Sequence, residues 1–424
     1  MNALVIGSGA REHAIVRALL ADPEVGRVDA APGNPGIAEV ATCHPLPDGV
    51  TDAAEIVRLA QQLDTDLVVI GPEVPLVAGV ADTLRDAGIT VFGPSGQAAQ
   101  LEGSKAFAKE IMAAADVPTS RSYVCTNDTE AAAALEATGA PYVVKDDGLA
   151  AGKGVVVTDS MDAALAHARG CFAAGGSVVV EEFLSGPEVS LFCITDGTTV
   201  VPLAPAQDFK RVGDGDAGPN TGGMGAYSPL PWAPAGLVDD VVARIAQPTV
   251  DEMRRRGTPF AGVLYVGLAL TPSGPRVIEF NARFGDPETQ VVLARLRTPL
   301  GGLLRAAATG ELDQQPPLVW REDAAVTVVV ASEGYPATPR TGDPIEGLTD
   351  GDGESYVLHA GTARDDSGAL VSAGGRVLSC VGTGPDLAAA RAAAYGVVGA
   401  VSLRGSHHRS DIAQAAADGT LTFA

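Results

Sequence analysis

The first hundred residues alternate short apolar stretches of strand length with amphipathic stretches of helix length. Near-continuous apolar strands separated by helices are typical of a parallel sheet that helices cover on both faces. Such sheets bind ligands at the carboxyl ends of their strands, where this chain places Gly and Asn residues. The opening of the chain therefore predicts a parallel α/β domain. In order, the segments read ALVIG, REHAIVRALL, RVDAAPGN, AAEIVRLAQQL, DLVVIGPE, PLVAGVADTLRDAG and TVFGP.

The remaining chain predicts further units, because 424 residues are too many for one ordinary core. A helix at SKAFAKEIMAAA precedes strand signals at YVVK, GVVVT, SVVVEEF and EVSLFCIT, and the loop 201–229 shows almost no periodicity. A long helix at DDVVARIAQPTVDEMRRR and the strands GVLYVGLAL and RVIEFNARF follow, and the chain then restarts at AAVTVVVAS as a small α+β unit. We expect domains at residues 1–102, 103–322 with a smaller subdomain at about 120–192, and 323–424.

Charge and composition exclude several classes of function. The 52 acidic and 29 basic residues give a formal net charge of −23, which would repel nucleic acid and anionic membranes. No apolar run is long enough to cross a bilayer, and the N-terminus lacks the basic stretch of a secretory signal, so we expect a cytoplasmic protein. The five cysteines lie far apart without metal-type spacing, which speaks against a disulfide framework or a zinc site.

Lysine is rare enough in this chain to mark candidate phosphate contacts. Arginine supplies most of the surface charge, and the compact lysine ammonium is not interchangeable with a guanidinium at a tight phosphate contact. A coding bias could also have left these few lysines by chance, and for Lys109 that alternative stays open. The lysines are Lys105, Lys109, Lys145, Lys153 and Lys210.

The segment Gly7–His13 follows the first strand and opens a helix, where backbone N–H groups can approach an anion. The dinucleotide fingerprint requires a third glycine where Glu12 stands, which disfavours NAD. Arg11 and His13 favour a phosphate or sugar site, and a tight turn without a ligand is the alternative.

The segment Gly148–Gly154 lies between two strand signals and resembles a P-loop only in part, because its glycine spacing is one residue short and Gly154 replaces the required Ser or Thr. A glycine flap over phosphates fits better. Lys145, at the end of the preceding strand, can direct its ammonium to the same place.

The strand Val277–Asn281 predicts a metal site. Side chains alternate along a strand, so Glu279 and Asn281 share one face and Ile278 and Phe280 the other. Two oxygen ligands on one rigid strand suit magnesium completed by substrate phosphates, with Arg283 in register beside them. A polar face turned toward water is the alternative.

The loop from Gln207 to Tyr227 mixes carboxylates, Lys210, Arg211 and glycines. Carboxylates can bind an amine and backbone N–H groups an acid, which predicts an amino-acid site, and a flexible linker is the alternative.

These motifs together resemble the glycinamide ribonucleotide synthetase family. The matches follow the family's order and cover essentially the whole chain, and DPETQ and GPNTGGMGAYSP are the most specific of them. The matching segments are GSGAREHA, APGNPG, Ile70–Glu73, LEGSKAFAK, VVKDDGLAAGKGV, VEEFLSGPEVS, AQDFKRVGDGDAGPNTGGMGAYSP, VIEFNARFGDPETQ, HAGT and Arg409–Ile412.

The resemblance implies an ATP-dependent ligase that joins glycine to 5-phosphoribosylamine in purine synthesis, with Mg²⁺ or Mn²⁺. It implies a mixed α/β and α+β fold, in which a parallel pre-ATP-grasp α/β domain precedes an ATP-grasp domain with a mobile B subdomain and a small C-terminal α+β domain. It leaves open whether the protein is a monomer or a homodimer.

The resemblance also implies the site residues. Arg283, Lys145 and Asp214 would act in catalysis, and Glu279 and Asn281 would bind the metal. The expected ATP contacts are Lys105, Lys145, Gly152, Lys153, Gly154, Glu181, Glu182, Phe183, Leu184 and Glu188. The expected contacts to phosphoribosylamine are Gly9, Arg11, Glu12, His13, Gly33, Asn34 and Glu73. The expected contacts to glycine are Asp208, Asp214, Gly222, Gly223, Met224 and Arg283.

Two departures from the family pattern bear on these expectations. Asp146 adds a negative charge beside Lys145, which would weaken nucleotide binding if the side chain pointed inward. The strand GVLYVGLAL offers no acidic metal ligand, which leaves the number of protein ligands open. Another ATP-grasp carboxylate–amine ligase or carboxylase is the nearest alternative function, and a nicotinamide oxidoreductase is a more distant one.

Overall fold

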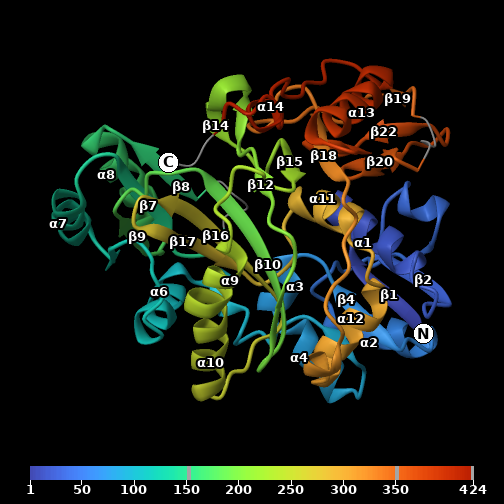
Figure 1. Cartoon of the computed structure of the whole chain (residues 1–424), viewed down its shortest axis with the longest axis horizontal. Helices are drawn as coiled ribbons and strands as arrows, with labels where there is room; N and C mark the ends of the chain where they lie inside the picture. Colours follow the sequence, from blue (N-terminus) through green and yellow to red (C-terminus); the bar gives the residue numbers. More distant parts are fainter. Residues whose placement is uncertain (150–153, 349–352, 422–424) are drawn as a thin grey trace.

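The N-terminal alternation forms a five-stranded parallel sheet in the computed structural model, which describes residues 1–149, 154–348 and 353–421 (Figure 1). The strand order is β3-β2-β1-β4-β5, and the central strands are buried on both faces, as their apolar sequences predict. The strands are β1 (Asn2–Gly7), β2 (Arg27–Pro32), β3 (Thr42–Cys43), β4 (Leu67–Ile70) and β5 (Val91–Phe92). The helices are α1 (Ala10–Leu20), η1 (Ile37–Glu39), α2 (Ala53–Gln62), α3 (Glu73–Val77) and α4 (Val80–Asp86).

A small lobe follows and projects to the left in Figure 1. Its four-stranded antiparallel sheet has the order β6-β9-β7-β8 and a core of its own around Leu135, Val144 and Val180. Helices α5 (Gln100–Gly103) and α6 (Lys105–Ala114) lead into it. The lobe comprises β6 (Ser122–Cys125), α7 (Asp128–Thr138), β7 (Tyr142–Asp146), β8 (Val155–Thr158), α8 (Met161–Ala173) and β9 (Val178–Glu181).

The central sheet is antiparallel with the order β11-β10-β16-β17. The expected long helix is confirmed as the continuous series α9, η3 and α10, with one π-helical turn at η3. Pro248 lacks the N–H that the Arg244 carbonyl would accept in a regular helix, which explains the irregular turn. The elements are β10 (Glu188–Asp196), β11 (Val200–Pro202), α9 (Leu237–Val241), η3 (Val242–Ala246), α10 (Gln247–Arg255), β16 (Ala261–Thr271), β17 (Gly274–Asn281), α11 (Glu288–Arg295), α12 (Leu300–Thr309) and η4 (Leu312–Gln314).

The C-terminal residues complete a second five-stranded sheet with the order β12-β15-β18-β23-β20. Helix α13 packs on β18 and β23. The C-terminal elements are β18 (Ala324–Ala331), β19 (Ile345–Glu346), β20 (Ser355–His359), β21 (Thr362–Arg364), β22 (Leu370–Ser372), β23 (Arg376–Gly384), α13 (Leu387–Ala400), β24 (Ser402–Leu403) and α14 (Gln414–Ala417).

The expectation that residues 201–229 lack regular structure is wrong. The segment forms β12 (Gln207–Asp208), β13 (Arg211–Gly213), η2 (Asp214–Asp216), β14 (Ala217–Asn220) and β15 (Gly225–Ser228). These strands are only two to four residues long, and β15 pairs with β18, about a hundred residues further along the chain. Strands this short carry little local periodicity, and their partners are distant in sequence.

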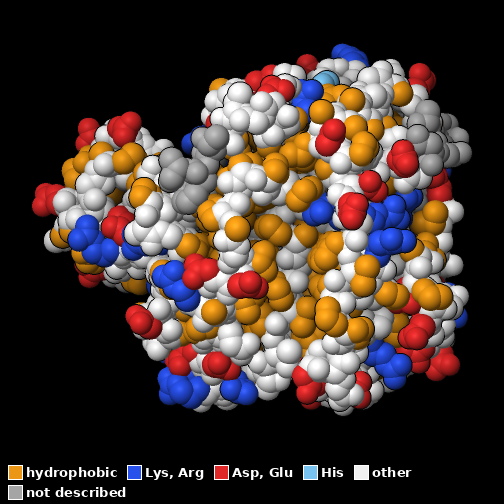
Figure 2. All heavy atoms as spheres, viewed as in Figure 1, with side chains coloured by type: hydrophobic (Ala, Val, Ile, Leu, Met, Phe, Trp, Pro, Cys, Tyr) orange, Lys and Arg blue, Asp and Glu red, His pale blue; other side chains and the backbone are white. Residues whose placement is uncertain are grey.

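The surface agrees with the charge balance of the sequence. On the face drawn in Figure 2, Lys and Arg side chains of the described residues occur in separate groups rather than as one continuous stripe. A continuous basic stripe is the usual footprint of a nucleic-acid-binding surface. No helix in the described part of the chain is both long and apolar enough to span a membrane.

Candidate active site

A cavity of about 1090 Å³ opens between the small lobe, the central sheet and the C-terminal residues. Strands β7, β8 and β9 line one wall and β17 another, while the loop 207–222 and the segment 409–421 contribute the rest. Arg11 and Glu73 bring the N-terminal unit to the same cavity. Residues from every part of the chain thus meet at one place.

Glu279 and Asn281 lie on the same side of β17, as strand alternation predicts. They pair with Gly267 and Tyr265 of β16 in unbroken register. Burial would raise the pKa of Glu279, but Lys210, Lys145, Lys105 and Arg283 together hold it below its usual value. Glu279 is therefore ionised at neutral pH.

Ile278, the residue before Glu279, departs from the strict alternation that we expected, because it forms a β-bulge. Gly267 pairs with Glu279 whereas Leu268 pairs with Val277, so Ile278 is an extra residue without an opposite partner. Its carbonyl oxygen instead accepts a hydrogen bond of 2.8 Å from Lys145 Nζ. The bulge therefore fixes Lys145 beside Glu279 and Asn281, the two candidate metal ligands. Ile278 itself lines the cavity.

Lys145 and Lys109 share one buried counter-ion, Glu181. Their ammonium nitrogens lie 3.1 Å and 3.2 Å from Glu181 Oε2, which also accepts a hydrogen bond from Ser120. Burial opposes ionisation of Glu181, but the two lysines outweigh it and lower its pKa. Burial lowers the pKa of Lys109 to about 8, although Glu181 opposes the shift. Lys109 therefore belongs to this ionic group. The sequence alone left open whether Lys109 remains only because of a coding bias.

Lys105 begins α6 and reaches across to the glycine flap, where its Nζ donates to the Gly148 carbonyl oxygen at 3.0 Å. Gly154 lines the cavity, whereas the predicted ATP contacts Gly152 and Lys153 lie outside the described residues. The rest of the expected nucleotide segment, Glu181–Leu184, lines the cavity too, and Phe183 has 46% of its surface exposed.

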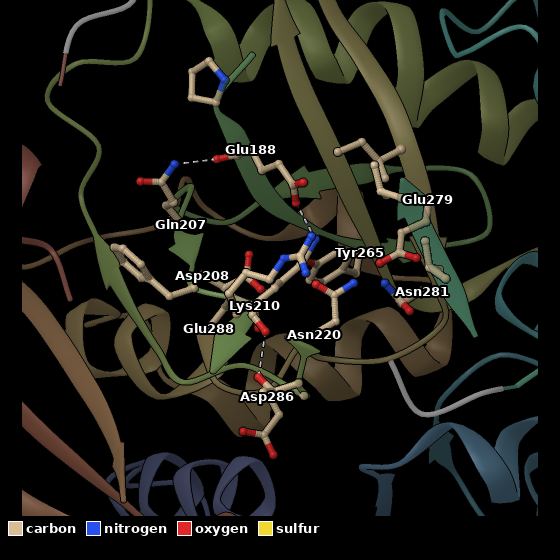
Figure 3. Close-up of a pocket in the computed structure, with 18 of the residues that line it drawn as sticks. Glu188, Gln207, Asp208, Lys210, Asn220, Tyr265, Glu279, Asn281, Asp286 and Glu288 are labelled. Atoms are coloured by element: carbon tan, nitrogen blue, oxygen red, sulfur yellow. Dashed lines mark hydrogen bonds and ion pairs between the residues drawn. The ribbon is translucent and has the colours of Figure 1, made fainter. Parts of the chain in front are cut away.

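A group of carboxylates surrounds Lys210 in the middle of the cavity (Figure 3). Lys210 Nζ lies 2.5 Å from Glu188 Oε2, and the side chains of Glu188, Lys210, Glu279 and Asn281 point toward one another. Burial raises the pKa of Asp208 to about 7, against the opposing effect of Lys210. The surplus of carboxylates over this one ammonium suits a divalent cation at the same place.

The donors fit magnesium or manganese. The Glu279 carboxylate makes no hydrogen bond or ion pair with another described residue, so both of its oxygens have lone pairs to offer, and Asn281 adds an amide oxygen beside them. Hard oxygen ligands are what these cations prefer, and the strand β16 supplies no further acid, as its sequence indicates.

Arg283, which follows β17 and its candidate metal ligands, connects this strand to the N-terminal unit. Its Nη2 lies 2.9 Å from Glu102 Oε1, and its Nε lies 3.4 Å from Glu73 Oε2. That Nε is buried but has no hydrogen-bond partner among the described residues. This Nε forms an ion pair with Glu73 but donates no hydrogen bond among the described residues, so it can still donate to an anionic ligand at the cavity wall.

The N-terminal turn differs from our expectation of an anion at a helix N-terminus. The carboxylate of Glu12 folds back over the start of α1, where it accepts hydrogen bonds of 2.6 Å from Gly9 N and Arg11 Nε. The chain's own side chain therefore occupies this helix terminus. Arg11 still lines the cavity, while Gly9, Glu12 and His13 lie behind it.

Gly33 and Asn34 lie beside the same turn, as the resemblance implies, but they do not line the cavity. Asn34 Nδ2 donates to the Ser8 carbonyl at 2.8 Å and to the His359 carbonyl at 2.9 Å. The structure thus brings the two predicted segments together and adds His359 from β20, which the sequence did not single out.

Asp214 is not placed with the other predicted substrate residues. It is exposed in η2 and does not line the cavity, and its carboxylate accepts hydrogen bonds from the backbone N–H and hydroxyl of Ser410. Asp208 and Gly222 do line the cavity, whereas Gly223 lies beneath Pro287 and Met224 is fully buried. The geometry of Asp214 therefore does not support the expected role as a substrate or catalytic contact, which stays a prediction.

Several cavity residues were missed by sequence reasoning. Glu288 begins α11 and accepts hydrogen bonds from Tyr265 at 2.8 Å and Ser190 at 3.1 Å. Its motif, DPETQ, is one of the segments that carry the family resemblance, but the sequence assigns no role to Glu288. Arg376 of β23 donates to the Gly222 carbonyl and lies 3.1 Å from Asp286. No local pattern marks Arg376, because its partners lie far away in the sequence.

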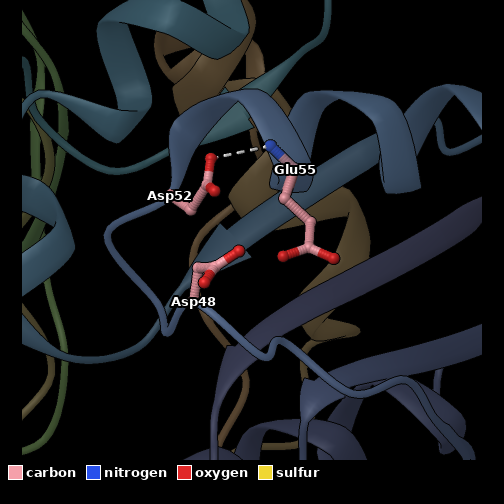
Figure 4. A group of neighbouring side chains, drawn as sticks. All are labelled: Asp48, Asp52 and Glu55. Atoms are coloured by element: carbon pink, nitrogen blue, oxygen red, sulfur yellow. Dashed lines mark hydrogen bonds between the residues drawn. The ribbon is translucent and has the colours of Figure 1, made fainter.

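One more cluster of acidic side chains lies away from the cavity (Figure 4). Oxygen atoms of Asp48, Asp52 and Glu55 lie within 4.8 Å of one another, and none of the three residues lines the cavity. Asp52 caps α2 by accepting a hydrogen bond from Glu55 N at 3.0 Å. Its position is explained by the helix that it caps.

The antiparallel lobe over a central antiparallel sheet, with lysines and a Glu–x–Asn strand facing one cavity, defines an ATP-grasp ligase. The comparison with family models narrows this class. The N, ATP-grasp (A) and C domain models of phosphoribosylglycinamide synthetase match residues 1–102, 103–289 and 325–415. The chain belongs to the phosphoribosylglycinamide synthetase family.

The sequences of named relatives match this chain over nearly their full length. The chain is 66% identical to a phosphoribosylamine–glycine ligase of Streptomyces coelicolor, covering 98% of this chain and 100% of that one. A ligase of the same name from Rhizobium meliloti is 49% identical and covers 97% and 98% of the two chains. The crystal structure of the Thermotoga maritima phosphoribosylamine–glycine ligase superposes with a TM-score of 0.84 at 34% identity, covering 97% and 100%. A biotin carboxylase domain of Hydrogenobacter thermophilus, at 16% identity and a TM-score of 0.74, covers 96% and 91% and shares the fold.

Proposed function

We propose that this protein uses ATP to join glycine to 5-phosphoribosylamine, which gives glycinamide ribonucleotide, ADP and phosphate in purine synthesis. The observation that carries the proposal is the pair Glu279 and Asn281 on one side of β17, facing the lysines of the same cavity. Family membership over the whole chain supports the choice of substrates.

The reaction begins when the glycine carboxylate attacks the γ-phosphorus of ATP and ADP leaves. The product, glycyl phosphate, is a mixed anhydride, and the amine of phosphoribosylamine then attacks its carbonyl carbon and expels phosphate. The protein contributes mainly by positioning the reactants and by offsetting charge. Lys105 and Lys145 contact the ATP phosphates, and Gly152, Lys153 and Gly154 are further phosphate contacts in this proposal.

The remaining ATP contacts follow from the cavity wall. The segment Glu181–Leu184 borders the adenine, and Glu188 reaches the ribose. Glu279 and Asn281 hold Mg²⁺ or Mn²⁺, which when bound offsets the negative charge of the phosphates during transfer. Strand β16 has no acidic residue, so β17 supplies the protein's main ligands for that ion.

The substrates occupy the two ends of the cavity. Asp208, the Gly222 turn and Arg283 border glycine, with Arg283 placed to offset the charge of the carboxylate under attack. Arg11 and Glu73 reach phosphoribosylamine directly, and Gly9, Glu12, His13, Gly33 and Asn34 shape the turn behind them. Arg283 supports this arrangement, because its guanidinium is paired with Glu73 and Glu102 while its buried Nε donates no hydrogen bond among the described residues.

We also propose the division into residues 1–102, 103–322 and 323–424, with the B subdomain at about 120–192. The bounds of the three family models support the first division and bracket the second. The separate core of the small lobe supports the subdomain.

An omission assay tests the function. ADP release is measured with phosphoribosylamine generated in the cuvette, and glycine, phosphoribosylamine and ATP are left out in turn. We expect ADP and glycinamide ribonucleotide to form only when all three are present. If bicarbonate or another amino acid supports ADP release in place of glycine, the chain is a different ATP-grasp ligase, and the proposal is wrong.

A further inference from the structure

The hairpin β13–β14 has no sheet of its own to join. It is a two-stranded sheet whose tip, residues 214–219, is exposed, and an isolated hairpin of this size is only marginally stable in water. Yet both of its ends enter the cavity, through Asp208 and Lys210 before β13 and through Asn220, the last residue of β14, and Gly222 after it. Asp208 is held by the pairing of β12 with β15, so the position of the hairpin decides mainly where Lys210 and Asn220 lie.

The contacts that hold the hairpin come mainly from three consecutive residues near the C-terminus. Arg409 has only 1% of its surface exposed, and its Nη1 donates to Asp216 Oδ1 at 2.7 Å and to the Arg211 carbonyl at 3.2 Å. Ser410 donates to Asp214 through its backbone N–H and its hydroxyl. Asp411 accepts a hydrogen bond of 2.9 Å from Gly215 N.

Arg409 is also fixed on its other sides. Its Nε and Nη2 form a bidentate pair with Asp411 at 2.7 Å and 2.6 Å, and its guanidinium lies 4.8 Å from the ring centroid of Phe209. The carbonyl of Arg409 accepts a hydrogen bond of 2.7 Å from Tyr395 of α13. Nearly all donors of the guanidinium are thus engaged by the protein, which marks a side chain that organises its neighbours rather than one that binds a ligand.

We propose that Arg409 is a positioning residue for the amino-acid substrate. It clamps the hairpin β13–β14 onto the C-terminal unit and so holds Lys210 and Asn220 at the glycine end of the cavity, beside Asp208 of β12. The inference rests on the proposed ligation of glycine. It also gives Asp214 a different role from the one its sequence indicates, because Asp214 contributes to the clamp and not to the substrate.

The test measures KM for glycine, KM for ATP and kcat for Arg409→Ala, Arg409→Lys, Asp214→Ala and Ser410→Ala. Arg404→Ala is the matched control, because Arg404 is exposed in the same segment and does not line the cavity. Arg409→Ala is expected to raise KM for glycine by roughly tenfold or more, with a smaller change in KM for ATP. Arg409→Lys, which keeps the charge but loses the bidentate geometry, is expected to fall between wild type and alanine.

The variants of the exposed residues Asp214 and Ser410 keep the test decisive even if Arg409→Ala folds poorly. The clamp predicts that Ser410→Ala, which keeps the backbone N–H bond, raises KM for glycine less than Asp214→Ala, which loses both bonds, and that the double variant is no worse than Asp214→Ala alone. A direct contact between Asp214 and glycine predicts instead that Ser410→Ala is silent, and this result would overturn the proposal. Unchanged KM for glycine in folded Arg409→Ala would overturn it too.

A structural loss of Arg409 would look different from the proposed effect. A lower melting temperature together with equal increases in KM for glycine, phosphoribosylamine and ATP, in both Arg409 variants, would also contradict the proposal. The wild-type protein separates this inference from the function itself. If wild type shows no glycine-dependent ADP release, the proposed function fails, whereas if wild type is active and the variants match it, only the clamp fails.

Discussion

Lys145 and Asp146 are neighbours on β7, and their side chains leave the strand on opposite faces. Lys145 points to Glu181 and to the Ile278 carbonyl at the cavity. Asp146 instead faces Gly176 and Cys171 near the end of α8, where, second to burial, it raises the pKa of the Cys171 thiol. The negative charge of Asp146 therefore lies away from the phosphate lysines, so it is not expected to weaken nucleotide binding.

Glu279 carries the first prediction at the scale of single residues. Replacing Glu279 with Gln keeps the size of the side chain but removes the charge that a divalent cation requires, so kcat should fall by roughly a hundredfold or more. The measurement is ADP release as a function of Mg²⁺ concentration, with melting temperature as the check on folding. Glu346→Gln, a change of the same type at an exposed position of β19, should behave as wild type. Full turnover of Glu279→Gln at saturating Mg²⁺ would show that the ion is held elsewhere.

The sequence predicted the site residues that depend on local geometry. Glu279 and Asn281 follow from the alternation of a strand, and Lys145 from the end of another. It could not reveal the placement of a side chain that a distant partner engages, as Ser410, 196 residues away, engages Asp214. It also missed Arg376, because nothing near Arg376 in the sequence shows that the Gly222 turn packs against it.

At the scale of elements, the start of α6 is joined to the glycine flap by one carboxylate. Asp147 Oδ1 accepts hydrogen bonds of 3.1 Å from Ala106 N and from the Ser104 hydroxyl, and Ser177 donates to Oδ2. Ser104 itself caps the helix at Phe107 N. A carboxylate at a helix N-terminus is favourable for the helix dipole. Because Lys105 is the first residue of α6, Asp147 helps to fix it.

Asp147→Ala should loosen this junction, since a lost N-terminal contact of this kind costs about 1 kcal/mol. The amides of residues 104–108 should exchange with deuterium several-fold faster, and KM for ATP should rise by about fivefold. Asp146→Ala is the matched control, because it changes the adjacent carboxylate on the opposite face. Equal effects of the two substitutions would mean that general charge, and not the contact with α6, is responsible.

The elements themselves were predicted where periodicity is strong. The predicted strands β1, β2, β4 and β5 of the N-terminal sheet and the long helix before β16 are confirmed, because each one buries enough apolar residues to leave a pattern. The fifth strand, β3, was not predicted, because it has only two residues and neither is buried. The strands β12 to β15 were not predicted, because two to four residues cannot show a period and because β15 is stabilised by β18.

At the scale of the whole molecule, two buried histidines join the beginning of the chain to its C-terminal unit. His13 Nδ1 accepts a hydrogen bond of 3.0 Å from the His359 backbone N–H, and the two rings lie 6.0 Å apart. Burial, reinforced by the neighbouring His359 and Arg17, lowers the pKa of His13 to about 3. Burial and Arg364 lower the pKa of His359 to about 4. Both side chains are therefore neutral in the folded protein at neutral pH.

This junction predicts a loss of stability in mild acid. An unfolded histidine takes up a proton near pH 6.5, whereas the folded ones do so only near pH 3 to 4, so the unfolded state binds more protons between these values. The free energy of unfolding should then fall as pH drops from about 6.5, by up to about 1.4 kcal/mol per pH unit for each histidine.

The measurement is the melting temperature from pH 7 to pH 4.5 for wild type and for His13→Gln, whose amide oxygen can still accept the His359 N–H. The variant should lose less stability on acidification than wild type does. His408→Gln serves as control, because His408 is exposed and an exposed imidazole is hydrated whether or not the chain is folded. Parallel curves for wild type and His13→Gln would contradict the assignment.

The five-stranded sheet that contains β12, β15, β18, β23 and β20 draws its strands from two separate stretches of the chain. A chain divided between residues 322 and 323 would leave β15 on one fragment and β18 on the other, each with an open edge ready to pair with any available strand. Attempts to exchange the C-terminal unit with that of a relative, or to produce the halves separately for complementation, should therefore move residues 207–228 together with it.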